Sequence, residues 1–250
     1  MKTASDLRRV SAGIGIAAAL ALLLAGVGCK NTNFLSTRDE VRIGRQASEE
    51  IDKEYRVETD TKDAARVRRI GERLLPHAEQ RRDVPYTFKV IDAPVVNAVS
   101  LPGGPVYVYR GLLDLAGSDD DAVACVIAHE IGHINARHAA KMISQQLAAN
   151  IGIAILVRGR DLQNLAGLAS DLINLSYSRD DEYEADRRGL SYAHKAGYDP
   201  RGMIRFFKLL QTMEKKGGGG PEFLRTHPLT KARIDRAERI IETQDYPYGQ

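Results

Sequence analysis

The chain has 250 residues, 43% of them hydrophobic and 28% charged, a composition typical of a globular protein with one well-filled core. One main domain is therefore expected. Setting aside residues 1–29, which hold three basic residues and one acidic one, reduces the formal net charge from +3 to +1, or 33 basic against 32 acidic residues. This balance gives no electrostatic argument for nucleic acid as a partner.

The first 29 residues are typical of an export signal. Lys2, Arg8 and Arg9 precede an uncharged apolar run that ends directly before Cys29. The stretch AGVGC resembles a lipobox, at which a bacterial lipoprotein is cleaved and its new N-terminal cysteine acylated, with Gly26 in the place where leucine is usual. Lipidation of Cys29 is therefore expected.

Three topologies are open for this segment. Acylated Cys29 would hold the protein on a membrane through its N-terminal lipid, ordinary cleavage would release it, and a retained anchor is the third alternative. All three place the body of the protein outside the cytoplasm. The expected organisation is a lipoprotein-type signal peptide at 1–29, a tether at 30–38 and a single domain at 39–250.

The predicted elements give an α+β fold class, mostly helical with a small β-sheet. Amphipathic helices are expected at 39–57 and 62–80, followed by two or three short strands between 84 and 109 around a Gly-Pro turn. Further helices are predicted at 119–141, 143–157, 162–176, 179–196, 200–215 and 229–243. The apolar segment 147–157 is too short to cross a membrane, and GGGG at 217–220 is expected to be a mobile loop.

The segment VIAHEIGHINARH at 126–138 contains the motif HExxH. On a helix, for which Ser118 is the predicted N-cap, His129 and His133 lie one turn apart in similar directions, so both imidazoles can bind one metal ion. Glu130 points about 100° away and can act on a metal-bound water without being a ligand. These roles are typical of metal-assisted hydrolysis, and a pair of core histidines is the alternative.

Two neighbouring side chains are not expected to bind the ion. If the helix continues to residue 141, His138 lies about 180° round from His129 on an apolar face, which favours packing or support of a ligand. Cys125 lies one turn before His129. Three ligands spread over two turns of one helix do not easily converge on a tetrahedral ion, so Cys125 is expected to be a buried free thiol.

A second helix, in SRDDEYEADRRGLSYAHKAG at 178–197, offers the carboxylate that a zinc site needs. Glu182 and Asp186 share a helix face with apolar residues, whereas Glu184 and Arg188 lie opposite and are expected to face water. A buried carboxylate needs a metal, a histidine or an arginine as its partner. Glu182 is therefore predicted to bind the ion while Asp186 orients a ligand histidine. A structural ion pair with a helix arginine is the alternative.

Taken together, these segments resemble one family. HEIGHINARH, YSRDDEYEADRRGLSYAHKAGYDPRGM and the preceding VNAVSLPGGPVYVYRGLL are similar to motifs of the HtpX and CAAX-protease type zinc metallopeptidases, especially their periplasmic BepA- and LoiP-like lipoprotein branch. The resemblance covers roughly residues 40–240. It implies a zincin-like metallopeptidase domain with one Zn²⁺ per chain, bound by His129, His133 and Glu182, with Glu130 as the base and Asp186 in support.

That family also carries a His-Pro near its end, which THPLTKARI at 226–234 matches. The resemblance implies that His227 reaches the site, either as a catalytic oxyanion stabiliser or as a reversible extra ligand that keeps the enzyme latent. A turn before the helix at Pro228 is the alternative. Since the chain ends at Gln250, without the helical repeats of BepA-like proteins, a minimal lipoprotein form is expected.

The predicted function is a zinc-dependent endopeptidase that degrades misfolded or misassembled envelope proteins. It is expected on the periplasmic side of the bacterial outer membrane, held by its lipid, with a soluble periplasmic form as the alternative. By analogy with other zincins, an extended substrate would pair with the strand around 97–101. The competing prediction is a zinc-stabilised, chaperone-like assembly factor for outer-membrane proteins with little or no proteolysis, against which the intact Glu130 argues.

Overall fold

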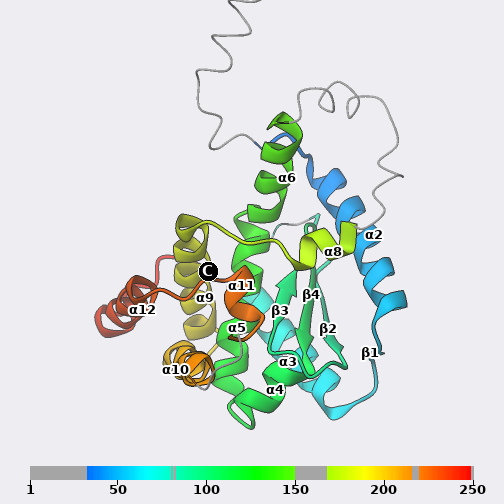
Figure 1. The fold of residues 1–250 in the computed structure, drawn as a ribbon. Coiled ribbons are helices and arrows are strands. Elements are labelled where there is room, and N and C mark those ends of the chain that lie inside the picture. The colour runs from blue at the N-terminus through cyan, green and yellow to red at the C-terminus, as the bar shows by residue number, and fades with distance from the viewer. Residues whose placement is uncertain (1–32, 80, 82, 150–167, 216–219, 249–250) are drawn as a thin grey trace, which may run out of the picture. The chain divides into compact units, whose positions relative to one another are not determined.

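The structure, a computed structural model, describes residues 33–79, 81, 83–149, 168–215 and 220–248 (Figure 1). The predicted signal peptide with Cys29, the start of the tether, residues 150–157 of the apolar segment and residues 217–219 of the glycine run lie outside these ranges. Within them, no helix combines the length and the apolar character needed to cross a membrane.

Helices make up most of the described chain, as predicted. They are α2 (Thr37–Glu54), α3 (Lys62–Leu74) with a 3₁₀ turn (Leu75–His77), α4 (Arg110–Ala116), α5 (Asp120–Asn135), α6 (His138–Ala149), α8 (Leu168–Ile173), α9 (Arg179–Lys195), α10 (Arg201–Lys215), α11 (Phe223–Thr226) and α12 (Lys231–Thr243). The predicted helices at 179–196, 200–215 and 229–243 are confirmed to within two residues at each end. Helices α4 and α11 were not predicted from the sequence.

A small mixed sheet lies beside these helices. Its strands are β1 (Val57–Glu58), β2 (Thr87–Ile91), β3 (Ala98–Ser100) and β4 (Pro105–Tyr109), in the order β1-β2-β4-β3. The β2–β4 pair is parallel, and the other two pairs are antiparallel. The strands predicted between 84 and 109 are confirmed, and β3 forms one edge of the sheet.

Strand β4 is buried on both faces. Its side chains point alternately to the two faces of the sheet, and helices cover each face. Val106 and Val108 pack with α3 and α5, whereas Tyr107 and Tyr109 pack with α2 on the other face. The hydroxyl of Tyr107 also donates a hydrogen bond to Asp52 of α2, at 2.8 Å. The edge strand β3 therefore rests on a sheet that is fixed from both sides.

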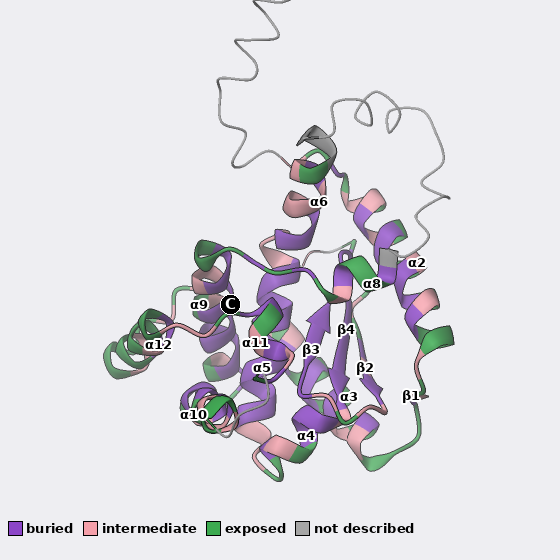
Figure 2. Cartoon of the chain, in the orientation of Figure 1, coloured by how far each residue is buried: buried purple, intermediate pink, exposed green. Residues whose placement is uncertain are grey.

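Helix α5 is buried over most of its length (Figure 2). Every residue from 122 to 134 is buried, because α3, α9, α10 and the sheet pack around the helix. An α-helix that is apolar all round belongs in a protein core. Its N-cap is Asp119, whose side chain accepts a hydrogen bond from the Ala122 amide at 3.0 Å, so the prediction of Ser118 was wrong by one residue.

The predicted continuous helix at 119–141 is wrong, because the chain breaks between α5 and α6. Arg137 adopts a left-handed conformation with φ of 60°. Its Nε donates to the carboxylate of Glu40 at 2.6 Å, and Glu40, only 1% exposed, also binds Arg81. Arg81 donates in turn to the carbonyl of Ile134 near the end of α5. The ion-pair cluster around Glu40 of α2 ends helix α5, and the local periodicity of the sequence does not indicate this end.

Helices α5 and α9 approach each other to backbone contact. A Cβ atom added to Gly189 would lie 2.9 Å from the amide nitrogen of His129, and one added to Gly132 would lie 3.1 Å from the carbonyl oxygen of Ala185. The two helices that carry the predicted metal ligands are thus held together without intervening side chains.

Candidate metal centre

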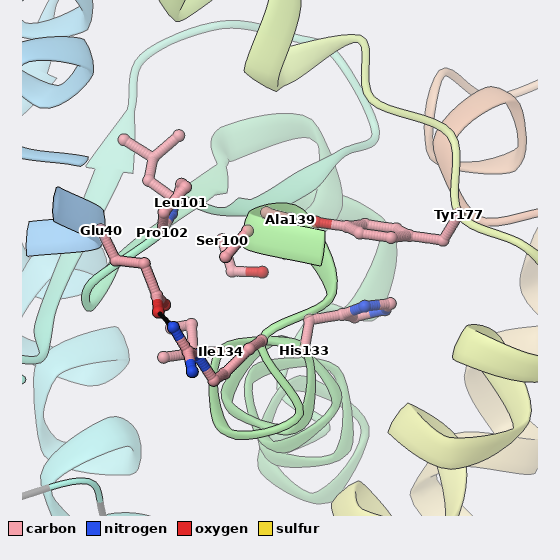
Figure 3. Close-up of a pocket in the computed structure, with 10 residues that line it drawn as sticks. Glu40, Ser100, Leu101, Pro102, His133, Ile134, Ala139 and Tyr177 are labelled. Carbon is pink, nitrogen blue, oxygen red and sulfur yellow. Dashed lines mark hydrogen bonds and ion pairs between the residues drawn. The ribbon is translucent and has the colours of Figure 1, made fainter. Parts of the chain in front are cut away.

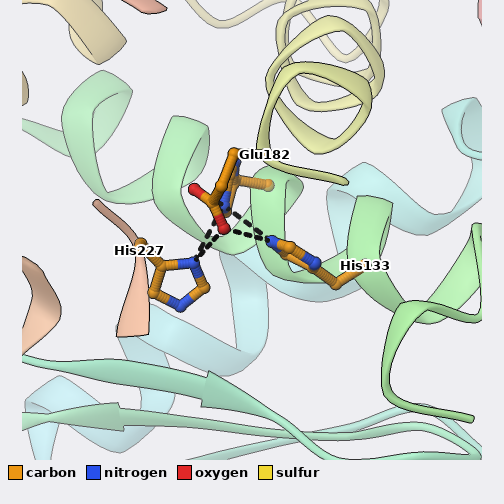
Figure 4. A group of neighbouring side chains, drawn as sticks. His133, Glu182 and His227 are labelled. Carbon is orange, nitrogen blue, oxygen red and sulfur yellow. Dashed lines mark hydrogen bonds and ion pairs between the residues drawn. The ribbon is translucent and has the colours of Figure 1, made fainter. Parts of the chain in front are cut away.

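Three imidazoles and one carboxylate converge at the contact between α5 and α9. The Nε2 atoms of His129 and His133 lie 3.0 Å apart, and Nδ1 of His227 lies 3.3 Å from the former. Oε1 of Glu182 lies 3.4 Å from His133 Nε2 and 3.0 Å from His227 Nδ1. Figure 4 shows Glu182 between the rings of His133 and His227. The four ligand atoms lie within 4.8 Å of one another.

This donor set fits a tetrahedral metal ion. An ion with ligand bonds of about 2.0–2.1 Å places its ligand atoms about 3.3 Å apart. Four of the six separations, at 3.0–3.4 Å, are close to this spacing, and all six lie within 4.8 Å. All four residues are 1% exposed, and buried imidazole nitrogens facing one another need a shared cation or a proton between each pair.

Three segments of the chain deliver these side chains. His129 and His133 lie one turn apart on α5, and Glu182 lies in the first turn of α9, which begins with a capping box between Ser178 and Asp181. His227 directly follows α11, and its amide donates to the carbonyl of Phe223 at 2.8 Å. The helical part of the site was thus open to prediction from periodicity, whereas the arrival of His227 depends on the tertiary fold.

Glu130 lies beside the donor set. Its Oε2 accepts a hydrogen bond from the hydroxyl of Ser100 on β3, at 2.7 Å. Its Oε1 has no hydrogen-bond partner among the described residues and lies 3.5 Å from His227 Nε2. The side chain is fully buried. One oxygen is therefore held by the edge strand while the other is free to accept a proton.

Asp186 contacts both a histidine and an arginine. Its Oδ1 lies 3.0 Å from His129 Nδ1, on the side of the ring opposite the donor set. Both of its oxygens also accept hydrogen bonds from Arg233 of α12, each at 2.8 Å. The histidine contact and the arginine ion pair, which the sequence analysis treated as alternatives, are thus present together.

Arg233 is a site residue that was not predicted from the sequence. It is 2% exposed, forms ion pairs with Asp186 and Glu182, and donates to the carbonyl of Pro228 at 3.1 Å. A signal was present in the sequence, because Arg233 shares a helix face with Ala237 and Ile240 at spacings of four and seven. An arginine on an apolar helix face predicts a buried carboxylate partner.

The charges of the site keep its carboxylates ionised. Burial by itself would raise the pKa of Glu182, but the charges of His227 and Arg233 and hydrogen bonds from both His133 and His227 hold that pKa well below its usual value. Burial opposes ionisation of Asp186 too, and Arg233 with His129 lowers its pKa. Burial lowers the pKa of His133, which favours the neutral ring that a metal ligand requires.

The site is closed on the side of His133. The ring of Tyr177 stacks on that of His133, with centroids 3.9 Å apart (Figure 3). Beside them lies a cavity of about 10 Å³, whose lining includes Ser100, Pro102 and Ala139. This space suffices for about one water molecule. A peptide side chain therefore enters only if the surrounding segments move.

Cys125 is buried and is a free thiol, as predicted. Its burial raises the pKa of the thiol, which suppresses the reactive thiolate. The other cysteine, Cys29, lies outside the described ranges.

Comparison with known proteins gives a consistent family match. The profile of Peptidase family M48 matches residues 61–241, a range that contains every side chain of the metal centre. The beta-barrel assembly-enhancing protease of Yersinia pestis is 28% identical over 191 residues, or 71% of this chain and 39% of that protein. Its Escherichia coli (strain K12) counterpart is 30% identical over 177 residues, or 66% of this chain and 36% of that protein.

A mitochondrial relative covers more of the chain. The mitochondrial metalloendopeptidase OMA1 of Schizosaccharomyces pombe is 30% identical over 216 residues, or 84% of this chain and 63% of that protein. The bacterial relatives are matched over only 36–39% of their own length. The profile match and the protease names confirm the metallopeptidase resemblance inferred from the motifs.

Replacing Arg233 by methionine should destabilise the metal-free protein by about 3–5 kcal/mol, because Glu182 and Asp186 would stay buried without their guanidinium partner. Urea unfolding measures the loss. Arg239→Met, at an exposed position of the same helix, is the matched control and should change the free energy of unfolding by less than about 0.5 kcal/mol. Equal effects of the two substitutions would contradict the assigned role of Arg233.

Proposed function

Because this chain belongs to peptidase family M48, we propose that it is a zinc-dependent endopeptidase of the bacterial cell envelope. The observation that carries the proposal is the convergence of His129, His133, Glu182 and His227 within 4.8 Å, with Glu130 beside them. In this proposal His129, His133 and Glu182 bind one Zn²⁺, a ligand set common in catalytic zinc sites.

The arrangement divides the chemistry among separate groups. Zinc, when bound, supplies a Lewis acid that polarises the scissile carbonyl and makes water more acidic. Glu130 takes the proton of the attacking water on Oε1 and passes it to the leaving amine, while Ser100 holds Oε2 in place. Asp186 Oδ1, 3.0 Å from His129 Nδ1, favours the tautomer of His129 that carries its proton on Nδ1 and leaves Nε2 free to bind the metal.

His227 is proposed to keep the site latent as a reversible fourth ligand. Structural zinc sites have four protein ligands, whereas catalytic sites keep one position open. The distances of 3.3 Å to His129 Nε2 and 3.0 Å to Glu182 Oε1 support the closed alternative, as does the burial of every ligand. Movement of α11 with His227 would then admit water and substrate.

The proposed substrates are misfolded or misassembled envelope proteins. Two relatives are named as beta-barrel assembly-enhancing proteases, which supports an envelope role. An extended peptide is proposed to pair with β3, since this edge strand carries Ser100 in contact with Glu130. Backbone pairing would give broad specificity.

The proposed location is the periplasmic side of the outer membrane, through a lipid on Cys29, with the domain at 39–250 as the peptidase. Labelled palmitate should enter the wild-type protein and not Cys29→Ala, because the acylated residue would be missing. Equal labelling of both proteins would place the lipid on another residue, and a wild type that takes up no label would leave the soluble periplasmic form.

The variant Glu130→Gln should keep its fold and its zinc but lose about 100- to 10,000-fold in casein cleavage, since the amide still accepts from Ser100 but does not take up a proton. Zinc content, circular dichroism and peptide release are the measurements. Glu214→Gln, on the exposed face of α10, is the isosteric control and should behave as wild type. A zinc-loaded wild type that binds unfolded clients and cleaves nothing would replace the peptidase proposal by the chaperone-like assembly factor.

His227→Ala should cleave casein faster than wild type at saturating zinc, because three ligands remain and the fourth position opens. The comparison is made on kcat/KM, with His77→Ala, outside the donor set, as the control. A decrease of about 100-fold or more with zinc retained would instead assign His227 to oxyanion stabilisation.

A further inference from the structure

We propose that His138 is a positioning residue for the metal ligand His133, as the middle member of a chain that ends at two carboxylates of α9. The inference rests on the proposed metal site and assigns the group that selects which nitrogen of His133 faces the ion. Three observations support it. The rings of His133 and His138 are in contact, which we call the inner contact. His138 also contacts two carboxylates of α9, which we call the outer contact, and a break after α5 brings the two rings together.

The inner contact joins two buried imidazoles. Nε2 of His133 lies in the donor set, and its Nδ1 lies 2.9 Å from Nδ1 of His138. At this distance one nitrogen donates a proton and the other accepts it. A ring that offers the Nε2 lone pair to a metal carries its proton on Nδ1. His133 is therefore the donor and His138 Nδ1 the acceptor.

The outer contact accounts for the remaining proton of His138. Since a neutral His138 that accepts on Nδ1 carries its proton on Nε2, the groups near Nε2 decide whether this tautomer is stable. Oδ1 of Asp181 and Oε2 of Glu184 both lie 3.5 Å from that nitrogen. Two carboxylates on this side favour a proton there, although neither contact meets hydrogen-bond geometry in the described part of the chain.

Neighbouring cations hold the two carboxylates in position. Lys141 of α6 lies 3.2 Å from Asp181 Oδ1, and Arg188 donates to Glu184 Oε1 at 2.8 Å. The expectation that Glu184 and Arg188 face water is wrong for Arg188, whose side chain is only 15% exposed. The side chain of Glu184 is 40% exposed, and its Oε2 lies 3.5 Å from His138 Nε2. Asp181 is fixed further by the capping box with Ser178.

The break after α5 makes this contact possible. On a continuous helix, His138 would lie five positions beyond His133, about 140° round the axis, where the two rings do not meet. The left-handed Arg137 turns the chain, so that His138 begins α6 and its ring packs edge-on to His133, with centroids 4.9 Å apart. Tyr177 covers the face of the His133 ring. The contact of His138 with the edge of that ring therefore determines how the His133 ring is turned.

A pair of near-isosteric substitutions separates positioning from packing. The side-chain oxygen of asparagine can occupy the place of Nδ1 in His138, whereas that of glutamine reaches toward the place of Nε2. Phenylalanine keeps the aromatic volume without an acceptor. Only His138→Asn should therefore preserve the partner of His133, although it fills less of the space than His138→Phe.

The test measures zinc affinity of the full chain by competition with a chromophoric chelator. His138→Asn should bind zinc within about threefold of wild type, and His138→Gln and His138→Phe about 10- to 100-fold more weakly. His194→Asn, at an exposed histidine of α9, is the control and should match wild type. Nitrogen-15 spectra of histidine-labelled, zinc-loaded wild type should show the proton of His133 on Nδ1 and that of His138 on Nε2.

Equal zinc affinities of the Asn and Gln variants, or wild-type affinity in His138→Phe, would overturn the proposal. So would spectra that place a proton on Nδ1 of His138, a readout that does not depend on whether any variant folds. A wild-type chain that binds no zinc refutes the proposed function itself, whereas zinc bound equally by all the variants refutes only the role of His138.

Discussion

The candidate metal centre depends on the backbone contact between α5 and α9. Gly189 lies so close to His129 that a Cβ atom would approach the backbone of α5 to 2.9 Å. Because ligand atoms of one ion must lie about 3.3 Å apart, the two helices have little freedom to separate. Burial of α5 on all sides fixes one partner, and the capping box at the start of α9 fixes the turn that carries Glu182.

Charge balance is the second constraint. Glu130, Glu182 and Asp186 are buried together, and Arg233 is the buried guanidinium that pairs with two of them. When the imidazoles are neutral, as metal ligands are, three carboxylates against one guanidinium leave two negative charges, which a divalent cation would balance. The same charges keep the pKa of Glu182 low, so its carboxylate is available to a metal. Arg233 therefore belongs to the site, although it is not one of the ligands.

Side chains next to the clustered histidines hold their rings in position. Asp186 contacts Nδ1 of His129, and His138 contacts Nδ1 of His133, so each histidine of α5 has a partner on the side away from the donor set. Such partners fix the tautomer and the orientation of a ligand ring. Glu40 supports this arrangement indirectly. Its ion pair with Arg137 stabilises the turn that places His138 beside His133.

Helical periodicity in the sequence was enough to predict that His129, His133 and Glu182 lie together. The four-residue spacing places His129 and His133 on one face of a helix. The apolar face of 179–196 likewise includes Glu182 and Asp186 and is expected to be buried. Both relations are local, because they follow from about 3.6 residues per helical turn. The end of α5 is instead a property of the folded chain, because Arg137 is held by Glu40, 97 positions away. The same is true of Arg233 and His138, which join the site through partners on other helices, and contacts between distant segments leave no period in the sequence.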